Sequence, residues 1–419
     1  MTFSDILTWA AAAYWVVAMG LLVISVVGTI LQPRIAARRA TRRDQPPVSI
    51  VLPVKLLEDG FDRTQESAFA QAYPSFDVTV SSAEAESPAV RRMREIFARH
   101  PERPSRVLLS TARFAASPKV DNLFAPFMQA QNDVILMKDA NVLLEPDALA
   151  QHMRQLTDEV GLVCAIPYCA GLENFAAHVE AAIINGPHAR MLFLASCLGQ
   201  GHGVGKIMLF RRSDFLRAGG FDAISHTVGE DNALAKAMRR IGRRPVFSHR
   251  PVRQKLGARA YGDVYHRQLR WSVIRRNDEL LSFLLEPICQ AFPAVIAGSL
   301  AAPLLGASHA AGFAATFLVW FALETLLSVA KGWQLSVAAP AVFIVREAMM
   351  IAVWVNAWMT DRVVWAKDKV HARVAAPPAP RARRRITFCC SDSSSSWSTR
   401  SPISASRSWS PSGSAISSS

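Results

Sequence analysis

The chain has 419 residues, of which 51% are hydrophobic, and its mean hydropathy is +0.17. This composition excludes an ordinary soluble protein, and the length allows one large domain together with further segments. The formal net charge of +14 suggests that the protein contacts an anionic partner, such as a lipid surface or a nucleic acid.

The first predicted element is a membrane anchor over residues 6–31. The stretch ILTWAAAAYWVVAMGLLVISVVGTIL carries no charge and exceeds the roughly 20 apolar residues that cross a bilayer. Because it has neither a basic start nor a small-residue cleavage site, we interpret it as a retained anchor and not as a signal peptide. By the positive-inside rule, the arginines that follow should stay in the cytoplasm with the domain after them. These are Arg34, Arg38, Arg39, Arg42 and Arg43.

The middle of the chain, from residue 46 to about residue 279, alternates β-rich runs with amphipathic stretches. The predicted strands are VSIVLPV (48–54), FDVTVSSA (76–83), RVLLST (106–111), DVILMKD (133–139) and GLVCAIPY (161–168). The predicted helices cover 89–100, 119–130, 145–156 with Pro146 in its first turn, and 229–240. This alternation predicts an α/β fold with a mostly parallel sheet, which binds ligands beyond the carboxyl ends of its strands.

From residue 287 the chain is apolar again. Residues 287–308 carry no charged residue, and the charged residue in 310–330 is Glu324. Residues 332–360 are apolar except for the charged pair Arg346–Glu347 and a few polar side chains. Three crossings after residue 287 would place the basic segment 381–385 outside the cell, against the positive-inside rule. We therefore predict two full crossings plus a segment that lies on or re-enters the membrane, with Arg346 and Glu347 near the membrane surface. The Pro-, Arg- and Ser-rich sequence after residue 377 cannot form a core and is predicted to be disordered.

The basic excess flanks these apolar segments. Residues 361–419 contain ten Lys/Arg and three Asp, a net charge of +7, and the five arginines after the anchor supply most of the remainder. This distribution favours contact with anionic lipid surfaces and argues little for nucleic acid.

The strand-end motif MKDANVLLEPD carries the first predicted chemistry. Asp139 ends an apolar strand and Asn141 follows two residues later. Their oxygens suit Mg²⁺ or Mn²⁺ bound to a diphosphate, although an Asp after a strand is also common in turns and helix caps.

Two helices carry the other polar motifs. Glu230 and Asp231 begin one helix, where the helix dipole favours acids and is expected to hold Asp231 ionised. In YHRQLRW, Arg267, Arg270 and Trp271 share a helix face that can bind a diphosphate and stack on a substrate. A basic amphipathic surface helix would show the same pattern.

Three motifs occur in a fixed order: a strand-end Asp-x-Asn, a Glu-Asp pair about ninety residues later, and a (Q/R)xxRW motif, which starts with Arg267 in this chain. Together they resemble inverting GT-A glycosyltransferases, and among them the ceramide glucosyltransferase family. The resemblance covers about residues 48–290 and the anchor before them. It includes the strings AYPSFDV, SPKVDNL, GLVCAIPY, FAAHVE, GPHAR and RRSDFLRAGGF.

The resemblance implies a role for each motif. Asp139, with Asn141, would hold the metal and the nucleotide diphosphate, and Asp231 would be the general base. Glu230 would orient or bind the acceptor. Arg267, Arg270 and Trp271 would clamp the leaving nucleotide.

Further positions match the family less fully. Lys119 and Asn122 would lie near the nucleotide, although a lysine at a helix start is often only solvated. His188 matches a histidine near the acceptor, although a lone histidine is more often structural. Glu84 stands where the family has an aspartate that meets the uracil and ribose. The glycines of GQGHGVGK precede a strand, which excludes a dinucleotide fingerprint.

The resemblance implies an inverting transfer of a hexose from a UDP-sugar, with UDP-glucose favoured, to a lipid hydroxyl, with ceramide favoured. It implies a multi-pass protein of the cell inner membrane with its catalytic domain in the cytoplasm. The expected organisation is an anchor and basic linker (1–46), a GT-A domain (47–280), membrane segments (281–360) and a basic, Ser-rich disordered tail (361–419).

Alternative functions remain. Diacylglycerol or a hopanoid are rival acceptors, because the sequence shows no acceptor code. A processive polysaccharide synthase shares the three motifs, but it needs a channel of many helices, and fewer than 80 residues of membrane sequence (287–360) follow the catalytic domain. A non-catalytic membrane scaffold would not need all three polar motifs.

Overall fold

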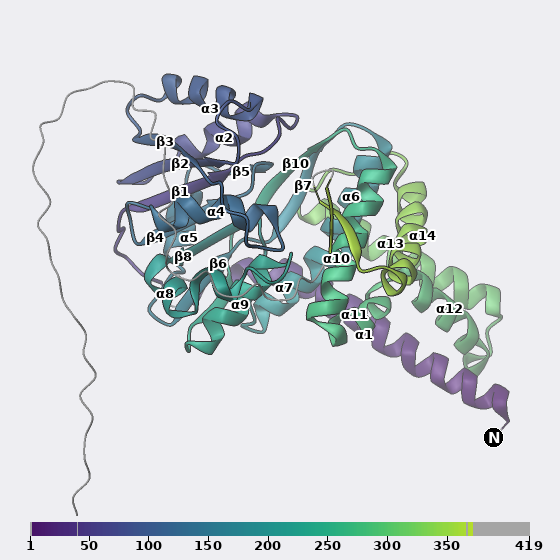
Figure 1. Ribbon diagram of the computed structural model, residues 1–419. Helices are drawn as coiled ribbons and strands as arrows, with labels where there is room; N and C mark the ends of the chain where they lie inside the picture. Colours follow the sequence, from purple (N-terminus) through teal and green to yellow (C-terminus); the bar gives the residue numbers. More distant parts are fainter. Residues whose placement is uncertain (1, 40, 366–367, 372–419) are drawn as a thin grey trace, which may run out of the picture. The chain divides into compact units, whose positions relative to one another are not determined.

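The computed structural model describes residues 2–39, 41–365 and 368–371, and its main feature is a seven-stranded sheet (Figure 1). In spatial order the strands are β3 (Ser105–Leu109), β2 (Phe76–Ser82), β1 (Val48–Pro53), β4 (Val134–Lys138), β8 (Ile207–Arg211), β6 (Val160–Cys164) and β9 (Arg244–Phe247). All are parallel except β8, which runs antiparallel to both of its neighbours. The predicted α/β fold with a mostly parallel sheet is confirmed.

Both faces of the sheet are buried, because β1 alternates its side chains between two cores. Ile50 and Leu52 pack into one core with the first group of helices, and Val51 packs into the other core with the second group. The first group is α2 (Phe61–Phe69), α3 (Pro88–Arg99) and α5 (Ala148–Met153). The second group is α4 (Pro118–Met128), α8 (Arg212–Arg217) and α9 (Glu230–Arg240), with the short turn η2 (Gly220–Ala223) between the last two.

A second, three-stranded sheet corrects two sequence predictions. It contains β5 (Val142–Leu143), β10 (Val252–Gly257) and β7 (Pro167–Leu172). The run 161–168 is therefore not one strand, since its first part is β6 and its end enters β7 in the other sheet. The helix predicted over 145–156 spans only Ala148–Met153, so Pro146 precedes its first turn.

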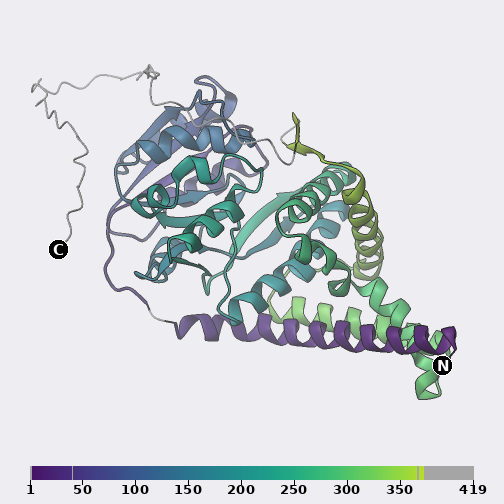
Figure 2. The same cartoon turned by 60° about the horizontal axis from the view of Figure 1, so that its bottom comes forward.

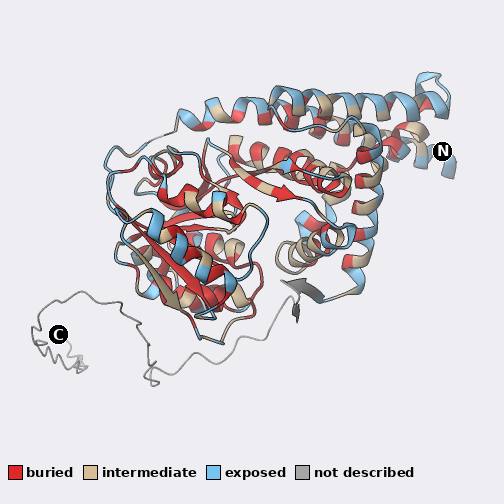
Figure 3. Ribbon diagram, turned by 90° about the horizontal axis from the view of Figure 1, so that it is seen from above, coloured by how far each residue is buried: buried red, intermediate tan, exposed pale blue. Residues whose placement is uncertain are grey.

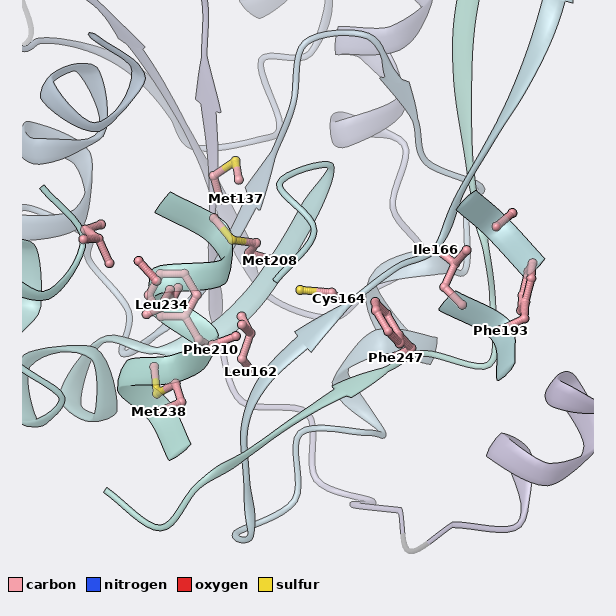
Figure 4. Packing of buried hydrophobic residues seen from close by; sticks show 14 of the residues in the cluster. Met137, Leu162, Cys164, Ile166, Phe193, Met208, Phe210, Leu234, Met238 and Phe247 are labelled. Carbon is pink, nitrogen blue, oxygen red and sulfur yellow. The ribbon is translucent and has the colours of Figure 1, made fainter. Parts of the chain in front are cut away.

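The helix α9 is fixed to the sheet by apolar side chains. Leu234 and Met238 point toward Phe210 of β8 and Leu162 of β6 in Figure 4. The helix begins at Glu230 as predicted, with Gly229 as the N-cap residue. The first turn of α9 thus lies against the segment that leads into β8, where the Gly205 N–H donates to Asp231.

Among the described residues, three helices are long and apolar enough to cross a membrane: α1 (Phe3–Ala37), α13 (His309–Ala330) and α14 (Ala339–Met359). A shorter apolar segment precedes the last two, formed by α12 (Ala291–Ala301) and η4 (Ala302–Leu305). Figure 3 shows exposed residues along α1, and many of the exposed residues on these three helices are large and hydrophobic. Such surfaces are typical of contact with lipid.

The helix α1 lies along α7 (Ala189–Cys197), α12 and α13 (Figure 2). At one end, the indole of Trp15 donates to the hydroxyl of Thr316 at 2.9 Å. Near the other end, Gln32 donates to the Ser196 hydroxyl at 3.0 Å and to the Ser248 carbonyl at 3.1 Å. Contacts therefore tie α1 both to α13 and to the α/β layers.

Four buried charges join these helices to the layers around the sheet. Arg190 of α7 pairs with Glu324 of α13 at 2.9 Å, and Arg346 of α14 pairs with both Glu324 and Glu347. Glu347 also accepts the backbone N–H of Ala291, at 2.7 Å. Arg346 and Glu347, which the sequence predicts near the membrane surface, are enclosed by protein, with exposures of 2% and 0%. We call these four side chains the ionic network.

The remaining elements connect these parts. They are α6 (Phe175–Ile183), the π-helical turn η1 (Ile184–His188), α10 (Tyr261–Asp278), α11 (Leu280–Leu284), η3 (Glu286–Cys289), β11 (Arg362–Trp365) and β12 (Asp368–His371). β11 and β12 pair where the predicted tail begins. The rest of that predicted disordered tail lies outside the described residues.

Candidate functional site

The two predicted metal ligands converge on one cation. Asp139 directly follows β4, and its Oδ2 accepts from Nζ of Lys206 at 2.7 Å. The Oδ1 of Asn141 accepts from the same nitrogen at 3.1 Å. Lys206 directly precedes β8. Because β8 runs antiparallel to β4, the amino end of β8 lies beside the carboxyl end of β4, and this brings Lys206 to Asp139. Sequence reasoning missed Lys206, although its place just before a predicted strand was a usable signal.

Three lysines set the charge of Asp139. Burial alone would raise the pKa of its carboxyl, but Lys206, Lys119 and Lys138 outweigh burial and hold that pKa below its usual range. Lys138 is itself fully buried, and this burial lowers its pKa to about 7. Asp139 is therefore ionised, with the Lys206 ammonium group as its partner.

Asp231 sits at the start of α9 and accepts two backbone hydrogen bonds. Its Oδ2 accepts from the Gly205 N–H at 2.7 Å, and its Oδ1 accepts from the Asn232 N–H at 2.8 Å. Burial and the neighbouring Glu230 nevertheless raise the pKa of Asp231 to about 6. Burial and the like charge of Glu230 thus outweigh the two backbone hydrogen bonds and Lys119, and a carboxyl with this pKa is still mostly ionised at neutral pH. A carboxylate with this pKa suits a general base near neutral pH.

Glu230 and Lys119 form a largely buried ion pair beside Asp231. Their Oε1 and Nζ atoms are 2.9 Å apart, and the Lys119 ammonium also donates to the Gly205 carbonyl at 3.3 Å. Burial would lower the pKa of Lys119, but Glu230, Asp139 and Asp231 raise it above its usual range. Lys119 is therefore a fixed positive charge within the site, and not a solvated surface lysine.

The glycines before β8 allow the chain to pass directly against α9. A Cβ on Gly203 would lie 1.9 Å from the carbonyl oxygen of Asp231, and one on Gly205 would lie 3.2 Å from Asp231 Oδ2. Any side chain at Gly203 would thus collide with backbone. These glycines allow the backbone to pack closely against Asp231, and they precede a strand as the sequence indicated.

The helix α10 brings its cationic face to the same site. Burial, followed by Arg267, lowers the pKa of Arg270 to about 10, while Asp139, Glu230 and Glu180 act in the opposite direction. These opposing carboxylates place Arg270 among the acidic groups of the site. Arg267 donates to Glu180 of α6 at 2.6 Å. Glu180 is fully buried and was missed by sequence reasoning, because a single acid in an apolar helix gives no pattern.

His188 contacts the same helix through its ring. Its ring centroid lies 5.8 Å from that of Trp271 in a tilted arrangement. Burial lowers the pKa of His188 to about 3, with a smaller contribution from Arg275 and Arg346. The imidazole is therefore neutral at ordinary pH, and its ring lies against Trp271 of α10.

The two remaining predicted residues lie beyond β2. The Nδ2 of Asn122 donates to the Ser81 carbonyl at 3.1 Å, and its Oδ1 accepts from the Ser81 hydroxyl at 2.6 Å. Asn122 thus holds α4 against the end of β2. Glu84 is exposed in the loop after this strand, with its backbone N–H donating to Ser82 Oγ at 3.2 Å.

The oxygens at Asp139 fit a divalent metal. A carboxylate and an amide oxygen already meet at one positively charged atom, and hard oxygen donors suit Mg²⁺ or Mn²⁺. Within the described part of the chain no group of three His, Cys, Asp or Glu side chains can hold a metal. Further ligands would therefore come from a bound diphosphate or water.

Comparison with known sequences finds one family model and relatives of related function. The family model for glycosyl transferase family 21 matches residues 12–375. Ceramide glucosyltransferase 1 of Caenorhabditis elegans is 24% identical over 232 residues, covering 55% of this chain and 50% of that protein. The ceramide glucosyltransferase of Komagataella phaffii is 22% identical over 303 residues, covering 57% and 58%. The chain thus spans about half the length of the curated relatives it matches.

Comparison with solved structures supports the fold. The mannosyltransferase PcManGT from Pyrobaculum calidifontis, solved with GDP-Man and Mn²⁺, matches with a TM-score of 0.50 and 17% identity. The match covers 84% of this chain and 99% of that one. The α/β layers described above therefore form a GT-A fold.

Proposed function

The chain belongs to glycosyl transferase family 21, and from this membership and its site we propose that it transfers a hexose from a UDP-sugar to the hydroxyl group of a membrane lipid. UDP-glucose is the proposed donor and ceramide the proposed acceptor. The observation that carries the proposal is the position of Asp231, a partly buried carboxylate with a pKa of about 6 beside the cations and oxygens of the candidate diphosphate site. The same compact unit includes the three long apolar helices.

The proposed reaction is a single inverting displacement. Asp231 takes the proton from the lipid hydroxyl as its oxygen attacks the anomeric carbon of the hexose. The bond from that carbon to the diphosphate breaks, and the nucleoside diphosphate leaves with the electron pair. Lys119 and Arg270 offset the negative charge that develops on the leaving group. Glu230 keeps Lys119 in place and raises the pKa of the base.

The α10 face serves as the proposed clamp for the nucleotide. Glu180 fixes the Arg267 guanidinium, so the face needs little reorganisation when a donor binds. A divalent metal held by Asp139 and Asn141 would neutralise the diphosphate.

Replacing Asp139 with Ala is expected to remove dependence on divalent ions and to lower transfer by about a hundredfold or more, because the diphosphate loses its metal ligand. Asn141→Asp is expected to keep or tighten metal binding, since a charged oxygen replaces a neutral one. Transfer rates measured across a Mn²⁺ titration test both. Undiminished activity in excess chelator would contradict the coordination argument.

The helix α11 supports a lipid acceptor. This helix and the residue after it expose four leucines shortly after α10: Leu280, Leu281, Leu284 and Leu285. Exposed leucines beside a charged site are typical of a segment that enters the surface of a bilayer. A lipid held at that surface can present its hydroxyl to the site without leaving the membrane. The five arginines that follow residues 6–31 support a cytoplasmic location for the site at the inner membrane.

Full-length enzyme in detergent micelles or bilayers is expected to transfer a hexose to ceramide, with the product identified by mass spectrometry. Diacylglycerol and a hopanoid serve as competing acceptors, and GDP-mannose serves as the competing donor. Removing residues 1–45 should weaken transfer more for long-chain than for short-chain acceptors, because α1 holds the site at the bilayer. Preference for a water-soluble acceptor would refute the lipid function.

A further inference from the structure

The position where the two expected metal ligands meet is already taken by an ammonium group of the protein. Nζ of Lys206 lies 2.7 Å from Asp139 Oδ2 and 3.1 Å from Asn141 Oδ1. A divalent ion bound to these oxygens needs distances of roughly 2.0–2.6 Å to them. The ion and the ammonium group therefore compete for one place.

The backbone holds Lys206 opposite Asp139. In the β4–β8 register Lys138 is paired with Ile207, and the next hydrogen bond runs from the Asp139 N–H to the Lys206 carbonyl at 3.0 Å. The side chain of Lys206 is only 13% exposed. Its proximity to Asp139 therefore follows from the sheet and not from a chance surface rotamer.

We propose that Lys206 is an internal counter-ion that closes the metal position of the donor site until a divalent ion displaces its ammonium group. This inference rests on the proposed metal role of Asp139. When no metal is bound, the ammonium group compensates the partly buried carboxylate of Asp139, whose desolvated charge would otherwise be costly. Binding of a metal alone must then break this pair and leave two cations close together.

A nucleoside diphosphate changes that balance. Its phosphate oxygens offer the displaced ammonium group a new anionic partner, since lysine is a common phosphate ligand. Metal and nucleotide are thus expected to bind cooperatively, and Lys206 is the positioning residue that creates the coupling.

The test measures Mn²⁺ binding directly on the full chain in detergent, using the electron paramagnetic resonance signal of free Mn²⁺ without sugar or acceptor. Lys206→Met, which keeps the side-chain length and removes the charge, should bind Mn²⁺ about tenfold more tightly than the wild type. Adding UDP should raise Mn²⁺ affinity by a smaller factor in this variant. Unchanged or weaker Mn²⁺ binding would overturn the proposal.

Three variants complete the test. Lys236→Met is the matched control. Lys236 forms an ion pair with Glu279, with their Nζ and Oε1 atoms 2.8 Å apart, and contacts neither proposed metal ligand. This variant should bind Mn²⁺ like the wild type. Lys206→Gln replaces Lys206→Met if the latter does not fold, with the same expected direction. Asp139→Ala should lose the site. If it binds Mn²⁺ normally, the proposed metal site fails, whereas loss in Asp139→Ala with no gain in Lys206→Met refutes only the counter-ion.

Discussion

Replacing Asp231 with Asn is expected to lower kcat by about 10²–10⁴-fold, the usual contribution of a general base. An amide has nearly the same shape but cannot take a proton from the acceptor. Its oxygen still accepts one of the two backbone hydrogen bonds, from Gly205 or Asn232, so the start of α9 should persist. Steady-state kinetics and UDP binding measure the two effects separately, and UDP binding should stay close to that of the wild type.

The pH profile identifies the base more specifically. Because the pKa of Asp231 is about 6 and only the ionised form accepts a proton, kcat/KM should fall about tenfold per pH unit below that value. Glu230 raises this pKa, so Glu230→Gln should move the acid limb to lower pH. Turnover of Asp231→Asn near the wild-type rate, or an acid limb that Glu230→Gln does not move, would contradict the assignment.

Replacing Arg346 with Met is expected to destabilise the protein by about 3–5 kcal/mol, because removing one partner leaves uncompensated buried charge. Arg346 pairs with Glu324 and Glu347, and without it the ionic network keeps two acids and one arginine. Thermal unfolding in detergent should show a large fall in the melting temperature.

The control for this prediction is Arg99→Met. Arg99 pairs with Glu66 at 2.6 Å, but both side chains are more than a third exposed, so the loss should be at most about 1 kcal/mol. Adding Glu347→Gln to Arg346→Met restores neutrality and should recover part of the stability. Equal melting temperatures for the Arg346 and Arg99 variants would show that the ionic network adds nothing to the attachment of α14.

Much of the fold followed from the sequence alone, because strands and helices are encoded by residues close together in the chain. The strands containing Val51 and Leu136, the start of α9 at Glu230 and the long apolar helix α1 all lie where periodicity and composition indicated. The prediction of a single strand over residues 161–168 was wrong, because two short strands of different sheets follow each other there without a turn signal in the sequence. Periodicity identifies a strand but not the sheet that it joins.

The candidate site divides in the same way. Asp139, Asp231 and Arg270 were predicted from residue types at the ends of elements and from a family resemblance. Lys206 and Glu180 were not, because each acts through a partner 67 or 87 residues away in the chain.

The ionic network was equally hidden, since its members come from separate helices. The raised pKa of Asp231 also depends on burial that no local pattern records. The sequence by itself determined which elements form and which acids and bases stand at their ends, since both are local properties of the chain. Only the tertiary structure decided which charges meet and how deeply they are buried, because Coulomb energy and desolvation depend on distances through space and not along the sequence.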